Sequence, residues 1–285
     1  MFRHQKELQF EAKPDKPNPL IAKYLQELIG GQYGEMSVAM QYLFQGWSCR
    51  GEEKYKDMLM DIATEELGHV EMLATMVARL LEGAPVEDQE EAMKKDPTLG
   101  AIISGMNPQH AIVAGLGPRP ADSVGNPWSG GYIIASGNML ADFRANLNAE
   151  SQGRLQVARI YEMIDDRGVK DLLSVLLARD SYHQNLWASA VKELETKEGS
   201  ILVPSTFPRE EERLDIAYDF YNFSEGDASS QGSWASGKAL DGEGEYQWLK
   251  EPKIEGKAPN LKPVTPKMYG TPKLKNKRYL SVYEK

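Results

Sequence analysis

The stretch LMDIATEELGHVEMLATMVARL, residues 59–80, decides the fold. Its apolar residues recur every three or four positions, which is the period of a helix with one buried face. Two polar residues, Glu66 and His69, fall on that face. The predicted buried face consists of Leu59, Ile62, Glu66, His69, Leu73, Met76 and Leu80.

Three further segments have the same period, so four helices are predicted, over residues 20–47, 52–81, 134–164 and 169–195. Each of them also places a carboxylate on its apolar face. In the last helix His183 follows its acid by three positions, as His69 does in the second, and i and i+3 side chains project from the same side of a helix. The four inward acids are Glu35, Glu66, Glu150 and Asp180.

The spacing of these acids predicts that they meet. Glu35 and Glu66 are 31 positions apart, Glu150 and Asp180 are 30 apart, and turns are predicted near the two midpoints. Residues equally distant from the turn of an antiparallel hairpin lie at the same height, here roughly 22 Å from the turn at about 1.5 Å per residue. The four acids therefore share one layer.

The order of the segments predicts the topology. Residues 1–19 are expected to form an extended N-terminal arm, residues 20–198 a bundle that holds a dinuclear metal site, and residues 199–285 an extended tail. A stretch rich in Gly and Pro between Gly83 and Gly131 is too long for a tight turn and predicts a crossover loop. Two hairpins joined by one long connection are typical of the ferritin-like four-helix bundle. The predicted class is all-α, with a mostly irregular tail that packs on the bundle and on neighbouring subunits.

Four carboxylates in a dry bundle would repel one another and lose their hydration, so bound cations are the natural compensation. An inward Glu-x-x-His unit is a recurring device of di-iron and di-manganese bundles. A single such unit often occurs by chance, but four inward acids with matched spacing strongly favour a metal site over a solvated surface. The other two histidines, His4 and His110, are expected to be ordinary surface residues of the arm and the loop.

The bulk composition narrows the possible functions. The chain of 285 residues is 41% hydrophobic and 26% charged, which is ordinary for a soluble globular protein. No run of about 18 apolar residues and no apolar leader occur, so we expect no membrane span and a cytoplasmic location. A net charge of −9 argues against nucleic acid as a partner. The single cysteine, Cys49, excludes a disulfide framework and a cysteine-ligated metal.

Five segments together resemble one known family, the manganese catalases, which are non-haem, dimanganese members of the ferritin-like superfamily. The match extends from about Glu7 to Trp248. The segments that carry it are GGQYGEMSVAMQY (30–42), ATEELGHVEM (63–72), NLNAES (146–151), RDSYHQNLW (179–187) and SGKALDGEGEYQW (236–248).

The resemblance implies two manganese ions per chain that disproportionate hydrogen peroxide to water and oxygen. Glu35 and His69 would bind one ion, Glu150 and His183 the other, and Glu66 would bridge the pair. Three carboxylates and one bridging hydroxide balance the charge of two divalent ions. The metals of the family cycle between the divalent and the trivalent pair, so no external electron donor is required.

Two residues beside the ligands are assigned differently. Asp180 stands where a di-iron bundle carries a second Glu-x-x-His glutamate, and its shorter side chain reaches about one methylene less far, so we predict it outside the ligand set. Tyr42 lies two turns after Glu35; it is either a core aromatic or a hydrogen-bond donor to a metal-bound oxygen. Some relatives carry an arginine that pairs with the acid at position 180, but here that residue is Ala149, which puts such gating of peroxide access in doubt.

A calcium site is a second implication of the resemblance. Asp57 and Asp61 are i and i+4 on the second helix, and the tail segment NFSEG resembles the element that completes a calcium site in some relatives. The possible ligands are Asp57, Asp61, Asn222, Ser224 and Gly226. A solvated acidic pair beside a polar turn is the equally weighted alternative. A homohexamer is what the resemblance implies for the assembly.

Two other functions remain open at this point. A di-iron ferritin-like peroxidase or oxidase would use the same fold with iron and an external reductant, but the second Glu-x-x-His and rubredoxin-type cysteines are missing. A structural component of the spore coat, where some relatives occur, would keep the bundle and serve in assembly. Loss of a ligand would favour that role, and all five ligands are present.

Overall fold

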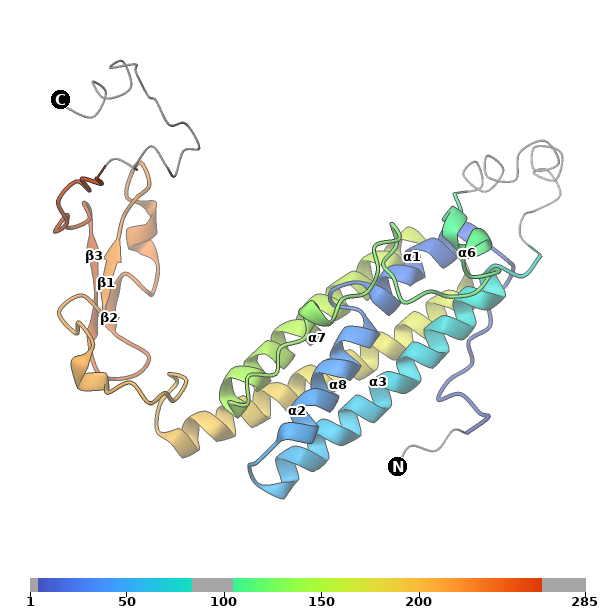
Figure 1. Ribbon diagram of the computed structural model, residues 1–285, viewed down its shortest axis with the longest axis horizontal. Helices are drawn as coiled ribbons and strands as arrows, with labels where there is room; N and C mark the ends of the chain where they lie inside the picture. Colours follow the sequence, from blue (N-terminus) through green and yellow to red (C-terminus); the bar gives the residue numbers. More distant parts are fainter. Residues whose placement is uncertain (1–4, 84–104, 263–285) are drawn as a thin grey trace, which may run out of the picture. The chain divides into compact units, whose positions relative to one another are not determined.

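The structure is a computed structural model, and it describes residues 5–83 and 105–262 (Figure 1). The chain divides into two compact units, residues 1–208 and 209–285, and each is described by itself below. His4, expected to be a surface residue of the arm, lies outside the described residues.

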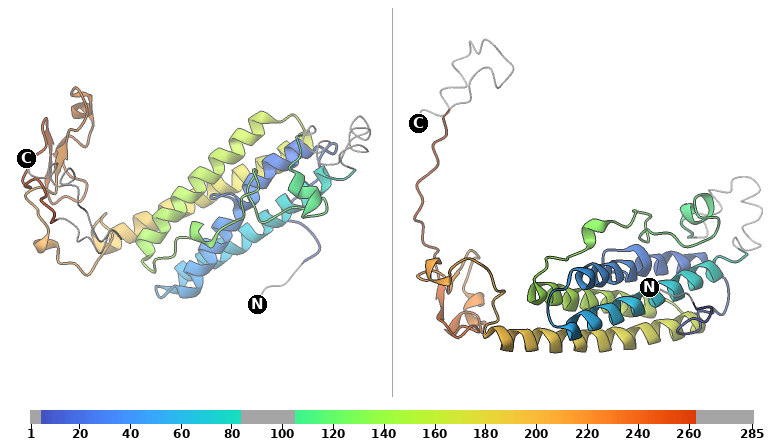
Figure 2. Two further views of the ribbon diagram at one scale, coloured as in Figure 1. Left: turned by 45° about the horizontal axis from the view of Figure 1, so that its top comes forward. Right: turned by 60° about the horizontal axis from the view of Figure 1, so that its bottom comes forward.

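The described part of the first unit is built from five long helices: α1 (Pro19–Gly30), α2 (Glu35–Ser48), α3 (Glu53–Leu80), α7 (Met139–Met163) and α8 (Arg167–Glu198). α2 pairs with α3 and α7 with α8, while α1 packs mainly on α3. Both views of Figure 2 show the helices running side by side along one bundle. The predicted ferritin-like bundle of two hairpins is therefore confirmed, and the two turns fall where the sequence placed them.

The predicted first helix is wrong in one respect, because residues 20–47 form two helices rather than one. α1 ends at Gly30, and α2 begins at Glu35 after the turn Gly31–Gly34. A Cβ on Gly34 would lie 2.8 Å from the carbonyl oxygen of Leu28, so only glycine allows the chain to turn this tightly. The break makes Glu35 the first residue of α2, with the unpaired backbone N–H groups of the helix start.

Two apolar clusters fill the bundle, one on each side of a polar layer. On α3, Ile62 belongs to one cluster and Leu73 to the other, with Glu66 and His69 between them. On α8, Trp187 and Leu176 flank Asp180 and His183 in the same way; all of these side chains are buried. The apolar clusters hold the helices together by the hydrophobic effect and leave the polar layer sealed from solvent.

The crossover loop is held to α1 by a buried amide. Gln26 donates from Nε2 to the carbonyl oxygen of Ala121 at 2.7 Å and accepts from the backbone N–H of Arg119 at 3.1 Å. A short helix, α6 (Pro108–Ile112), places His110 against the same side chain, with its Nε2 3.1 Å from Gln26 Oε1. His110 is fully buried, so its predicted surface position is wrong. The loop composition gave no sign that part of the loop packs into the bundle.

Replacing Gln26 by alanine is expected to destabilise the bundle by about 2–4 kcal/mol. The change leaves the Arg119 N–H and the Ala121 carbonyl without a partner, and each unpaired group costs about 1–3 kcal/mol. Urea unfolding followed by circular dichroism measures the difference. The exposed Gln32 provides the matched control, and equal stability of the two alanine variants would contradict the tethering role.

The N-terminal arm joins the two hairpins. Asp166, the N-cap of α8, accepts hydrogen bonds from the backbone N–H groups of Val169 and Asp15, and Asp15 accepts one from the backbone of Arg167. Arg79, near the end of α3, donates to the carbonyl oxygen of Ala12, which is fully buried. The arm thus makes contacts at the end of α3 and at the α7–α8 turn.

The second unit contains a small mixed sheet that the sequence interpretation did not predict. Its strands are β1 (Asp219–Tyr221), β2 (Ser236–Lys238) and β3 (Glu245–Leu249), in the order β1-β3-β2. β1 runs parallel to β3, and β2 runs antiparallel to it. With three to five residues each, these strands are too short to give a clear period in the sequence.

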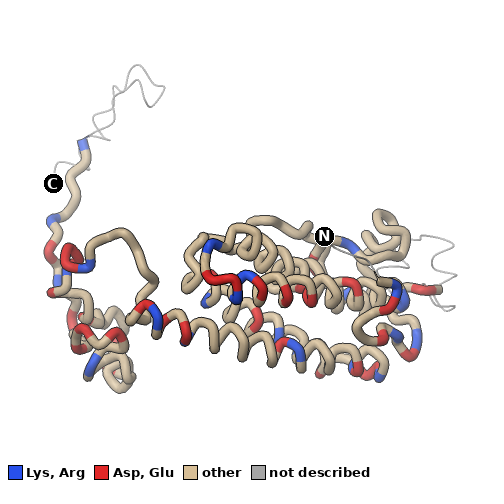
Figure 3. Tube along the Cα trace, turned by 90° about the horizontal axis from the view of Figure 1, so that it is seen from below, with Lys and Arg blue, Asp and Glu red and all other residues tan. Residues whose placement is uncertain are grey.

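The surface carries charges of both signs. Lys and Arg are interspersed with Asp and Glu along the helices (Figure 3). Within the described residues, no helix is long and apolar enough to cross a membrane.

Candidate metal centre

The polar layer brings together side chains from all four helices of the two hairpins. α2 supplies Glu35, α3 supplies Glu66 and His69, α7 supplies Glu150, and α8 supplies His183. Each of the five is at least 93% buried, and the two histidines are completely so. Their potential ligand atoms form two groups, within each of which all atoms lie within 4.8 Å: Glu35, Glu66 and His69 in one, and Glu66, Glu150 and His183 in the other.

Glu66 is the member shared by both groups. Its Oε2 lies 2.6 Å from Nδ1 of His69, and its Oε1 lies 2.7 Å from Nδ1 of His183. The two imidazole rings are stacked, with 6.0 Å between their centroids. Each oxygen of one carboxylate therefore faces a different histidine, which is the arrangement that a bridging carboxylate needs.

Glu35 and Glu150 flank this pair on opposite sides. Oε2 of Glu35 lies 3.7 Å from Nδ1 of His69, and Oε1 of Glu150 lies 3.8 Å from Nδ1 of His183. Tyr42 donates its hydroxyl hydrogen to that same oxygen of Glu150 at 2.6 Å. The tyrosine is fully buried against Trp187 and approaches a predicted ligand directly.

The electrostatics show that the carboxylates are not balanced by protein groups. Burial and the neighbouring Glu66 carboxylate raise the pKa of Glu35 to about 8. Burial and Glu66 also raise the pKa of Glu150 well above its usual value. Burial opposes ionisation of Glu66 as well, but the two histidines outweigh it and hold the pKa of Glu66 below its usual range. Only one of the three glutamates is thus stabilised as a carboxylate by the protein alone.

The buried polar atoms of this layer fit a pair of divalent cations. Both oxygens of Glu66 and both nitrogens of each histidine are buried and lack a hydrogen-bond partner with good geometry. Such atoms are costly unless a partner compensates them. Carboxylate oxygens and imidazole nitrogens are the ligands that divalent first-row metals accept. The residues present therefore fit two metal ions.

Asp180 lies beside the layer and outside both groups of ligand atoms. It lines a space of about 10 Å³ together with Glu35, Glu150 and Ala149. This volume is just enough to hold one water molecule. Burial, with Glu66 adding to it, raises the pKa of Asp180 to about 7. An acidic group that holds a proton near neutral pH therefore borders the small space next to two predicted ligands.

Glu65 is a residue that the sequence interpretation missed. Its carboxylate lies behind both imidazole rings, and Arg179 of α8 holds it. A signal for this pair exists in the sequence, since Glu65 stands four positions before His69 and Arg179 stands four positions before His183. Opposite charges at matched positions of the two motifs indicate an ion pair between the two helices.

The proposed calcium ligands fall in separate units. Asp57 and Asp61 are exposed on α3 of the first unit. Asn222, Ser224 and Gly226 belong to the second unit, where the side chain of Asn222 closes a tight turn by donating to the Gly226 carbonyl and accepting from the Ser224 N–H.

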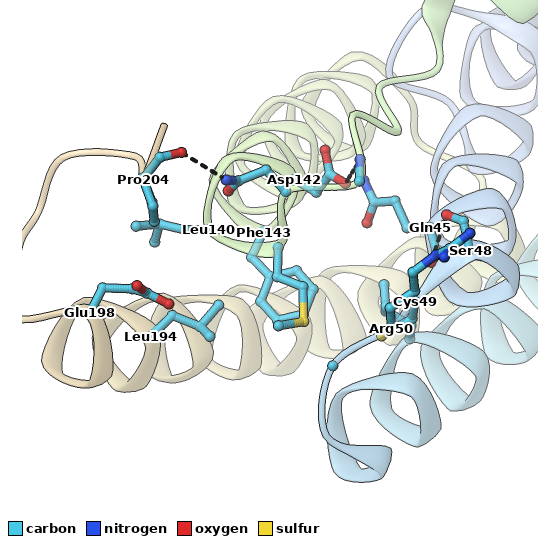
Figure 4. A pocket seen from close by; sticks show the side chains of 15 residues that line it. Gln45, Ser48, Cys49, Arg50, Leu140, Asp142, Phe143, Leu194, Glu198 and Pro204 are labelled. Atoms are coloured by element: carbon cyan, nitrogen blue, oxygen red, sulfur yellow. Dashed lines mark hydrogen bonds between the residues drawn. The ribbon is translucent and has the colours of Figure 1, made fainter. Parts of the chain in front are cut away.

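A larger cavity, of about 360 Å³, lies at the end of the bundle away from the metal layer. Figure 4 shows its walls, which come from the end of α2, the start of α7 and the end of α8, with Asn138 donating to the Pro204 carbonyl at 3.2 Å. The five predicted ligands do not line this cavity. Its size alone therefore does not make it the reaction site.

Comparisons with known proteins agree on one family. Residues 1–281 match the family model described as manganese containing catalase. A manganese catalase of Bacillus subtilis (strain 168) is 62% identical over 271 residues, which cover 95% of this chain and 98% of that protein. One from Lactiplantibacillus plantarum is 43% identical over 269 residues, covering 94% and 98%. The crystal structure of wild-type KatB, a manganese catalase from Anabaena, superposes with a TM-score of 0.67 at 30% identity and covers 88% of this chain and 100% of that one.

Proposed function

The chain belongs to the manganese-containing catalases, which convert hydrogen peroxide to water and oxygen, and we propose that its reaction takes place at two manganese ions held in the polar layer of the bundle. The proposed ligands are Glu35, Glu66, His69, Glu150 and His183.

The observation that carries the proposal is the position of Glu66. Its two oxygens face the Nδ1 atoms of two different histidines at nearly equal distances, 2.6 and 2.7 Å. Glu35 and His69 lie together on one side of it, and Glu150 and His183 on the other. This arrangement supports two ion positions, with Glu66 as the residue that would be shared by both.

The established reaction, 2 H₂O₂ → 2 H₂O + O₂, consists of two half-reactions of opposite sign. When bound, the manganese pair supplies a store for the two electrons that one peroxide gives up and a second peroxide takes back. The protein keeps the centre dry, since the layer lies between two apolar clusters. A dry site strengthens the attraction between the three carboxylates and the cations.

Asp180 is the residue placed to handle protons. Oxidation of one peroxide releases two protons, and reduction of the next consumes two. Asp180 is a carboxyl group that borders the small space next to Glu35 and Glu150 without belonging to either group of ligand atoms. Its position beside the ligands therefore supports a role in taking up a proton in one half-reaction and returning it in the other.

Ala149 lines the same space. A methyl group stands there beside Asp180, where some relatives carry an arginine. Asp180 has no ion-pair partner at that position, and α7 lines the space with Ala149, Glu150, Gly153 and Val157. The approach of peroxide in this chain is thus not gated by an ion pair between positions 149 and 180.

Replacing Tyr42 by phenylalanine is expected to lower kcat about 10- to 100-fold. The hydroxyl that donates to Glu150 is lost, and partners that orient a metal ligand typically contribute this much to affinity or activity. Steady-state oxygen evolution and metal content measure the effect. Tyr161→Phe, on α7 at the edge of the apolar cluster, is the control and should behave as wild type. Equal rates for the two variants would contradict the orienting role.

Metal analysis of the purified protein, together with oxygen evolution from peroxide, tests the proposed function. Two manganese ions per chain and oxygen release without a reductant support it, and resistance of the activity to azide excludes contaminating haem catalase. Iron at the same ligands, with peroxide consumed only when a reductant is added, indicates a di-iron peroxidase instead. Bound metal with neither activity indicates a structural role, such as that of a spore-coat component.

Calcium and the assembly form the remaining part of the proposal. We place calcium between Asp57 and Asp61 of one chain and the turn Asn222–Gly226, whose carbonyl and amide oxygens suit this cation. A tail joined to a neighbouring bundle in this way supports a homohexamer. The same metal analysis reports calcium, and its removal by a chelator is expected to reduce the mass measured by light scattering. We also retain the cytoplasm as the expected location, with the spore coat as the alternative.

A further inference from the structure

The carboxylate of Glu65 lies on the outer side of both metal-binding imidazoles. Its Oε1 is 3.6 Å from Nε2 of His69, and its Oε2 is 3.4 Å from Nε2 of His183. Glu65 directly precedes the bridging Glu66 on α3, but the two side chains leave the helix about 100° apart. Two consecutive residues of α3 thus place one carboxylate on each side of the histidine pair.

The ring nitrogens divide in the same way. Both Nδ1 atoms face the inner carboxylates, at 2.6 and 2.7 Å from Glu66. Both Nε2 atoms point outward and have no hydrogen-bond partner with good geometry in the described part of the chain; Glu65 is the acid beside them. Because the rings are fully buried, solvent does not solvate these N–H groups.

Arg179 fixes the position of Glu65. Its Nε and Nη2 atoms donate to Oε1 and Oε2 respectively, which is a two-pronged contact between a guanidinium and a carboxylate. The guanidinium also lies over the ring of Tyr182, 4.9 Å from its centroid. α3 and α8 make few direct contacts with each other, so this ion pair links the two helices that carry the histidines.

The Glu65–Arg179 ion pair lies at the surface of the bundle between α3 and α8. Glu65 and Arg179 line a surface cavity of about 510 Å³, together with Gln9, Asp61, Thr64 and Val175. On its inner side the same carboxylate faces the buried rings. The side chain of Glu65 is 24% exposed and that of Arg179 is 40% exposed, so the pair forms the boundary between solvent and the metal layer.

We propose that Glu65, held by Arg179, is a positioning residue shared by both metal-binding histidines. With metal bound at the two Nδ1 atoms, its oxygens, which lie 3.6 and 3.4 Å from the Nε2 atoms, would accept the Nε2–H of each ring and so fix the tautomer in which the Nδ1 lone pair faces the metal. The proposal rests on the proposed function, because it requires the metal ligands to be His69 and His183.

Two consequences follow from sharing one carboxylate. A negative acceptor behind an imidazole raises its basicity as a ligand, and Arg179 neutralises that charge, so the ligand strength increases without adding net charge to the centre. Since the same group serves both rings, its loss weakens both ion positions together. A separate partner for each histidine would weaken only one.

The test compares Glu65→Gln with Glu195→Gln. Glu195 also pairs with an arginine, Arg144, at similar exposure, 28% and 34%, but far from the metal ligands along α8. Equilibrium manganese binding to metal-free protein, measured against a competing chelator, gives the affinity of both ions. We expect Glu65→Gln to weaken both by about 10- to 100-fold and Glu195→Gln to leave both unchanged. Thermal unfolding of the metal-free variants reports whether the two glutamines affect folding equally.

Arg179→Lys provides a second variant. Lysine keeps the charge but cannot make two parallel hydrogen bonds, so a smaller loss for both ions is expected. The electron paramagnetic resonance signal of the manganese pair should change with Glu65→Gln and Arg179→Lys and not with the control. Affinities equal to those of Glu195→Gln, or a loss confined to one ion, would overturn the shared role while wild-type binding of two ions leaves the proposed function intact. Failure of the wild-type protein to bind two ions would overturn both.

Discussion

Replacing Glu66 by glutamine is expected to remove bound manganese and to lower the rate of oxygen evolution by more than about 100-fold. The side chain presents one oxygen to each of His69 and His183. Glutamine keeps one oxygen and replaces the other by an amide NH₂, which cannot bind a cation. Since residues that only orient a ligand already contribute 10- to 100-fold, loss of the ligand common to both ions should exceed that range.

The measurement is kcat and manganese content in the same preparation. Glu53→Gln, in the exposed first turn of the same helix, is the matched control. Circular dichroism of the metal-free proteins separates loss of the ligand from loss of the fold. Two ions per chain and a rate within a few-fold of wild type would show that Glu66 does not bridge the metals.

Replacing Glu35 by glutamine is expected to change the stability in opposite directions with and without manganese. Burial and Glu66 raise the pKa of Glu35 to about 8, from 4.5. The metal-free folded state therefore binds more protons than the unfolded state between these pH values, so its stability falls as the pH rises from 4.5 to 8. At pH 7 this amounts to roughly 3 kcal/mol, which glutamine removes.

The free energy of unfolding, measured with a chemical denaturant at pH 7 and at pH 4.5, tests this prediction. Without metal, Glu35→Gln should be more stable than wild type at pH 7, and the difference should disappear at pH 4.5. With manganese added, wild type gains binding energy that the variant lacks, so the order reverses. Glu162→Gln, exposed on α7, should follow wild type under all conditions. A variant less stable than wild type in the metal-free state would contradict the account.

Much of the site could be predicted from the sequence, for a physical reason. A helix that buries one face must place its core residues at a period near 3.6, so polar residues on that face stand out. Glu66 and His69 interrupt the stripe of α3 in this way, and the equal distances to the turns then place Glu35 and Glu150 at the same height. The height of a residue along its helix depends only on its distance in sequence from the turn, so the sequence is enough to predict which residues lie at the same height.

Other features depend on tertiary contacts that produce no periodic pattern in the sequence. The break between α1 and α2 arises because the chain passes close to carbonyl oxygens at Gly34, and a glycine in an apolar pattern is also compatible with a continuous helix. His110 is buried because the crossover loop packs on Gln26, and loop composition does not show this. Glu65 lies off the buried stripe, and Arg179, which holds it, is 114 positions away. The identity of the bound metal is decided by supply as well as by ligands.

The hydrogen bonds that join Asp15 of the arm to Asp166 at the start of α8 have a consequence for the order in which the chain folds during synthesis. Its two halves are 151 positions apart, and at about 5–20 residues per second the ribosome needs roughly 8–30 s to deliver the second half after the first. During that interval the first hairpin carries Glu35, Glu66 and His69 without the acid and histidine of the second. The arm leaves the ribosome before the bundle and is seated only after α8 has begun, so completion of the metal centre and docking of the arm both wait for the synthesis of α8.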